Sequence, residues 1–185
     1  MKRYTKLNII LMAILAVAMF ASGCDDKQVA EANKLVDSAN KKMNDAKPLM
    51  TKASETFSKI SDKVQDFDEG KKAHEAELKE LLTSYDKILE LYKGAAADFG
   101  GASKLNSDAT FKAYYDMSQK DMENSAALVS QNKVLVQAFI DAKTAEDYSK
   151  KLDEIKAKND DLKKEGDDIA AKLKKLEADV NAKNK

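Results

Sequence analysis

Apolar residues recur in alternating steps of three and four positions over residues 29–67. Such a period of 3.5 residues places one apolar seam along a gently supercoiled helix. The spacing predicts a helix over residues 26–68, with Asp25 or Asp26 as its N-cap. Pro48 lies off the seam and is expected to kink this helix. The seam consists of Val29, Ala32, Val36, Ala39, Met43, Ala46, Met50, Ala53, Phe57, Ile60, Val64 and Phe67.

A second helical pattern covers residues 71–99, after a predicted turn at residues 68–70. Gly100 and Gly101 are expected to end it, because glycines commonly follow the last helical turn. Residues 102–107 are expected to form a loop. The seam of this helix is His74, Leu78, Leu81, Tyr85, Ile88, Tyr92, Ala95 and Phe99.

The two seams pair well when the chain is folded back at residue 69, so that facing residue numbers add up to about 138. This register sets Ala46 against Tyr92 and Ala53 against Tyr85. Large side chains then meet small ones, as dense packing requires. The pattern predicts an antiparallel hairpin.

Two further helices are predicted over residues 109–142 and 145–181. Ser107 or Asp108 is expected to cap the first, and Thr144 with Asp147 has the spacing of a capping box at the start of the second. Folding back between residues 143 and 144 sets Tyr148 on Phe139. We therefore expect an all-α fold with a single domain over residues 24–185, an up-down-up-down antiparallel four-helix bundle made of long coiled-coil hairpins.

The helix over residues 109–142 carries two parallel rows, so the neighbours Tyr114 and Tyr115 are expected to face different ways. The inner row is Phe111, Tyr114, Ser118, Asp121, Ser125, Leu128, Asn132, Leu135 and Phe139, and the row beside it is Tyr115, Met122, Val129 and Val136.

Polar residues interrupt this inner row and the facing row of the last helix. One interpretation is a polar slot in the bundle that binds a small molecule or a lipid. The other is control of helix register, which one core Asn can provide at some cost in stability. We favour register control and expect a hydrogen bond between Asn132 and Asn159. The polar positions are Ser118, Asp121, Ser125, Asn132 and Asn159, and Gly166 is expected opposite Asp121 and Met122.

No constellation for catalysis or metal binding stands out. His74 is the only histidine, and no second histidine or metal-binding cysteine motif accompanies it. Non-covalent haem held by His74 and a methionine is the weaker alternative to a half-buried structural histidine. We predict neither an enzyme nor a cofactor.

The first 26 residues have the layout of an export signal. Lys2, Arg3 and Lys6 precede an apolar run over residues 9–20, and small residues then lead to Cys24, the only cysteine. This segment resembles the lipobox signal of bacterial lipoproteins, although Ala21 stands where that family most often has Leu. The resemblance implies cleavage before Cys24, with residues 1–23 removed. It further implies a diacylglycerol thioether on Cys24, often with N-acylation.

Two alternatives to lipidation stay open, an ordinary cleaved signal and an uncleaved anchor. The apolar run is short for an anchor, since a spanning helix needs about 20 apolar residues. Asp25 matches the pattern that retains lipoproteins in the inner membrane of enteric bacteria.

Charge excludes one class of partner. After removal of residues 1–23, 29 lysines face 32 acidic residues, a net charge of −3, and no arginine is left. Interspersed lysines without arginine do not suit nucleic acid. The sequence thus predicts a membrane-anchored lipoprotein on the extracytoplasmic side of a bacterial membrane. It would act as a spacer or protein-interaction module, with the ligand-binding bundle as the alternative and oligomeric state left open.

Overall fold

A computed structural model describes residues 26–63, 67–106 and 108–183. Over these ranges the fold is all-α, as predicted, with helices α1 (Asp26–Lys63), α2 (Phe67–Ala73), α3 (Glu75–Leu105), α4 (Ala109–Asp141) and α5 (Ala145–Lys183). The signal-like segment, Cys24, Val64 and Ser107 lie outside the described residues.

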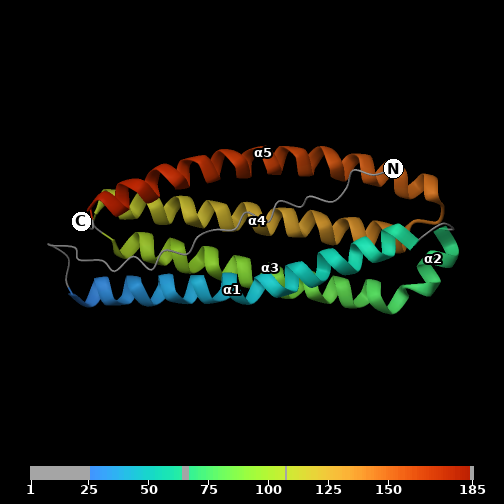
Figure 1. Ribbon diagram of the computed structural model, residues 1–185, viewed down its shortest axis with the longest axis horizontal. Coiled ribbons are helices and arrows are strands. Elements are labelled where there is room, and N and C mark those ends of the chain that lie inside the picture. The colour runs from blue at the N-terminus through green and yellow to red at the C-terminus, as the bar shows by residue number, and fades with distance from the viewer. Residues whose placement is uncertain (1–25, 64–66, 107, 184–185) are drawn as a thin grey trace.

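The long helices pack in chain order: α1 against α3, α3 against α4, and α4 against α5 (Figure 1). The start of α1, the α3–α4 connection and the end of α5 lie at one end of the elongated molecule, and α2 lies at the other. Each end is tied by a lysine. Lys183 pairs with Asp108 at 2.6 Å, and Lys71 donates to the carbonyl of Ala142 at 2.6 Å.

The heptad seam of α1 faces the interior as predicted. Every seam residue of α1 whose side chain is described is buried or half-buried, and Ala39 and Ala46 are fully covered. Pro48 lies inside α1 on its exposed side. Burial of such a continuous apolar row is the main source of stability for helices of this length.

Three contacts between α1 and α3 toward the end where α1 begins have residue numbers that add up to within two of the predicted 138. Lys42 pairs with Asp98 and with the Ser38 hydroxyl. A Cβ on Gly101 would lie 2.9 Å from Leu35, and one on Gly94 would lie 3.0 Å from Lys42. Small residues on α3 therefore let the two helices approach closely.

The turn predicted at residues 68–70 is wrong. These residues belong to α2, and the break between α2 and α3 falls at His74, which has φ −117° and ψ 16°. A glycine inside a helix costs only about 1 kcal/mol, so Gly70 does not end this one. Lys71 and Lys72 in its last turn favour it, because positive charge stabilises a helix C-terminus.

The helix end predicted at Gly100 and Gly101 is also wrong. α3 continues to Leu105, so most of the predicted loop is helical, and Asn106 is the C-cap. The glycines meet neighbouring helices instead: a Cβ on Gly100 would lie 2.5 Å from the Oε1 of Gln119. Their small size serves close helix packing rather than chain reversal.

The last two helices end within two residues of the predicted positions. Asp108 caps α4, and its carboxylate accepts from the backbone N–H groups of Thr110 and Phe111. Thr144 caps α5 by accepting from the N–H of Asp147 at 3.1 Å. The row predicted to lie beside the inner row of α4 is the more deeply buried one: Tyr115, Met122, Val129 and Val136.

Candidate functional site

The polar residues that the sequence singled out lie along α4 and α5, but their burial differs. Ser118 and Asp121 are buried, whereas Ser125, Asn132 and Asn159 are half-buried. Ser118 donates to the carbonyl of Tyr114 at 2.9 Å, one turn earlier in α4. This bond satisfies the hydroxyl within its own helix, so Ser118 offers little to a ligand.

Asp121 is the buried carboxylate of this row. It is 7% exposed, and no ion pair reaches it from the described residues. Burial raises its pKa from 3.8 to about 6, because the interior solvates the charged form poorly. Its negative charge also contributes to the raised pKa of Tyr92 on α3 and of Tyr114 on α4, for both of which burial is the larger cause.

Asn124 is a buried polar residue that the sequence analysis missed. Its side-chain amide donates to the carbonyl of Leu162 on α5 at 3.0 Å. A Cβ on Gly166 would lie 2.9 Å from the Oδ1 of Asn124. The sequence placed Asp121 and Met122 opposite Gly166, but the side chain that occupies the space there is that of Asn124.

The predicted hydrogen bond between Asn132 and Asn159 is wrong. No such bond joins them, and the Oδ1 of Asn159 is buried without a partner in the described structure. Asn124 supplies the polar tie between α4 and α5 instead. The reason is geometric, since the absence of a Cβ at Gly166 lets an amide reach the backbone of α5 there.

Aromatic rings fill the interior toward the end where α1 begins. The rings of Tyr114 and Tyr115 meet edge to face at 5.6 Å, and Phe99 stacks on Tyr115 at 6.5 Å. Tyr115 is 1% exposed and Tyr114 is half-buried, so the two neighbours face different ways, as predicted. This cluster is core packing rather than an exposed contact surface.

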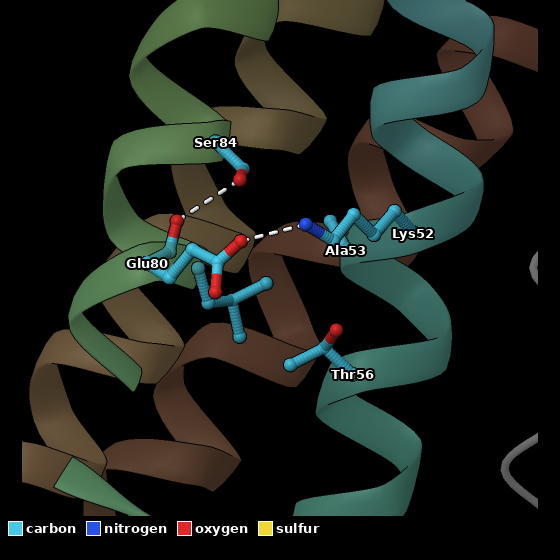
Figure 2. A pocket seen from close by; sticks show the side chains of 6 residues that line it. Lys52, Ala53, Thr56, Glu80 and Ser84 are labelled. Atoms are coloured by element: carbon cyan, nitrogen blue, oxygen red, sulfur yellow. Dashed lines mark hydrogen bonds and ion pairs between the residues drawn. The ribbon is translucent and has the colours of Figure 1, made fainter. Parts of the chain in front are cut away.

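A shallow depression lies between α1 and α3 (Figure 2). Lys52 and Glu80 form an ion pair of 2.6 Å across it, and the Ser84 hydroxyl donates to the carbonyl of Glu80. Its volume of about 180 Å³ includes open solvent. Ligand sites for drug-sized molecules usually hold at least about 300 Å³, so this depression suits at most a very small solute.

His74 does not take part in a metal centre within the described residues. It lies at the α2–α3 junction with its Nδ1 against the carboxylate of Glu77. No group of three or more His, Cys, Asp or Glu side chains in the described part of the chain is arranged to hold a metal ion. Among the described helices, none is both long and apolar enough to cross a membrane.

Comparisons with models of known protein families, with curated proteins and with solved structures found no match to this chain.

Proposed function

We propose that the chain is a lipid-anchored protein of a bacterial cell envelope, attached through Cys24 after loss of residues 1–23. Its body would be an up-down-up-down antiparallel four-helix bundle that acts as a spacer or as a protein-interaction module. It would face the extracytoplasmic side, with the inner membrane favoured by Asp25 in a Gram-negative host.

One observation carries this proposal: the lipobox-like segment is followed almost immediately by a long helix. Cys24 is the only cysteine, and α1 begins at Asp26 and runs for 38 residues. At 1.5 Å per residue, α1 spans about 57 Å. A lipid on Cys24 would thus be joined to a rigid rod through Asp25 alone, an arrangement suited to holding a surface away from a membrane.

The exposed surface favours the spacer over an apolar docking module. Among the described residues, one large hydrophobic residue is exposed: Val134, with 46% of its surface accessible to solvent. Partners that bind tightly usually bury aromatic or aliphatic anchors, which this surface offers sparingly. We therefore expect any protein partner to contact mainly lysine and acidic side chains.

A second candidate function, binding of a small molecule or lipid in the bundle interior, draws support from Asn159. A buried amide oxygen without a partner costs free energy, and a ligand group could satisfy it. Native mass spectrometry of protein purified from its own host would test this candidate. A bound species of reproducible mass that the Asn159→Leu variant lacks would favour it over the spacer.

Metabolic labelling with a palmitate analogue tests the anchor. We expect the wild-type protein to be labelled and to fractionate with membranes, and the Cys24→Ser variant to be unlabelled. Peptide mapping should place the mature N-terminus at Cys24. Equal labelling of the two proteins, or a different mature N-terminus, would overturn the proposal. Separation of inner from outer membranes then locates the protein.

A further inference from the structure

The last helix contributes fewer buried residues to the core clusters than the other long helices do. Within the described residues α5 packs extensively on α4 alone, whereas α3 packs on both α1 and α4. In Figure 1, α5 runs along the outer edge of the molecule, with α4 beside it. Five of the 39 residues of α5 are buried, against ten of the 31 residues of α3. Because stabilisation scales with buried apolar area, α5 gains less from docking than α3 does. α1 also packs on one neighbour, but all six of its buried residues belong to the core clusters.

The surface that α5 covers is also partly polar. The apolar row of α4 joins two core clusters with residues of α1 and α3, and of the buried residues of α5 only Val180 belongs to either cluster. Across the α4–α5 interface, Asn124 makes a hydrogen bond, but the Oδ1 of Asn159 has none. Unpaired polar atoms weaken an interface, because they give up hydration without compensation.

Asp121 is a buried carboxyl group on the same side of α4 as the bond to α5, because it lies one helical turn before Asn124. Around its carboxylate, α3 contributes the Tyr92 phenol and α4 contributes the Tyr114 phenol. From α5, the carboxylate of Glu177 contributes to the raised pKa of Tyr114. No charged group of the described residues shifts the pKa of Asp121 itself. A carboxylate in this position has no cation to offset its lost hydration, so opening of the interface would favour its charged form.

The connection between α4 and α5 can act as a hinge. Residues 142–144 link the two helices, and Ala142 has an extended backbone with φ −61° and ψ 135°. Thr144 caps α5 from within this link, so α5 would keep its N-terminal cap when it moves. A few residues at the end of an element are sufficient for hinge motion.

We propose that α5 is a releasable strap that swings away from α4 about residues 142–144, and that the protonation state of Asp121 sets how often it opens. The inference does not depend on lipidation of Cys24. Below a pH of about 6 the protonated carboxyl tolerates burial, and the strap stays closed. Above it, the ionised carboxylate is better hydrated in the open state, and opening becomes more frequent.

Hydrogen exchange of the full chain, followed by mass spectrometry at pH 5 and pH 7.5, tests the strap. After correction for intrinsic exchange, opening of α5 should increase about tenfold between these pH values, from a pKa of about 6 when closed and 3.8 when open. Exchange in α1 and α3 should not follow. Unchanged protection of α5 in the wild-type protein, or exchange of α5 in step with α3, would overturn the proposal.

Two variants assign the effect to one carboxyl group. Asp121→Asn should abolish the tenfold change and leave α5 protected at both pH values. Glu123→Gln removes an exposed carboxylate two residues away on α4 and should keep the change intact. If Asp121→Asn retains the wild-type pH dependence, Asp121 does not control the strap.

Discussion

Asn124 occupies the space that a side chain at Gly166 would need. The Oδ1 of Asn124 lies 2.9 Å from the position of a Cβ on Gly166, while its Nδ2 donates to the carbonyl of Leu162 at 3.0 Å. The two residues form a polar lock between α4 and α5, in which the missing side chain of one makes room for the amide of the other. A lock of this kind specifies which residues of the two helices meet, because a shift along either helix would bury the amide without its partner.

The first prediction tests this lock. Gly166→Ala should gain up to about 1 kcal/mol of helix propensity but displace a hydrogen-bonded amide, which costs about 1–3 kcal/mol. We expect net destabilisation of about 1 kcal/mol by chemical denaturation. In an Asn124→Ala background the same change should stabilise instead. If Gly166→Ala has the same effect in both backgrounds, the two residues are not coupled.

The second prediction concerns the pH dependence of global stability. Asp121 has a folded pKa of about 6 and an ordinary value of 3.8, so the folded state holds the proton more tightly. Its contribution to the free energy of unfolding is therefore greatest below pH 3.8, falls as the pH rises to about 6, and is constant above that. Asp121→Asn should stabilise the protein by up to about 3 kcal/mol at pH 7 and by much less at pH 3.5. Thermal unfolding of both proteins across this range measures the difference, and parallel curves would contradict it.

The sequence predicted the helices and their seams because apolar periodicity is a local signal. Ala39, Ala46 and Ala53 recur every seven residues, and all three are buried against α3. The capping residues Asp108 and Thr144 were also readable, since a side-chain oxygen at the start of a helix has a specific bonding role there. These features depend on residues close together in the chain.

The errors arose where a residue's role depends on another helix. Gly100 and Gly101 look like helix terminators until Gln119 and Leu35 are seen packed against them. Asn124 lies off the row that the heptad spacing marks as inner, so its bond to Leu162 could be found only from the packing of α4 on α5. Gly166 itself was the one usable signal in the sequence, because a glycine in the middle of a helix often marks a place where a neighbouring element packs closely.

The third prediction separates packing glycines from terminating ones. Gly100→Ala should stabilise the protein by up to about 1 kcal/mol, because the half-buried Gln119 amide can rotate toward solvent. Gly101→Ala should lose about 1 kcal/mol, because its new methyl presses on Leu35, which packs against a core cluster. Denaturant midpoints of the two variants give the comparison. Strong destabilisation by both would instead indicate that the glycines adopt a non-helical backbone.

The fourth prediction tests the packing of α1 on α3. Lys42 pairs with Asp98, and Leu35 meets Gly101, so Ala46 and Tyr92 are expected to face each other. Cysteines at positions 46 and 92, in a Cys24→Ser protein to avoid competing thiols, should oxidise efficiently to an intramolecular disulfide, which requires Cβ atoms about 4 Å apart.

A cysteine pair at positions 46 and 81 provides the matched control, because position 81 lies eleven residues, or about 16 Å, along α3 from position 92. Mobility on non-reducing gels distinguishes the products, and preferential linkage of 46 with 81 would show that the two helices are paired in another register.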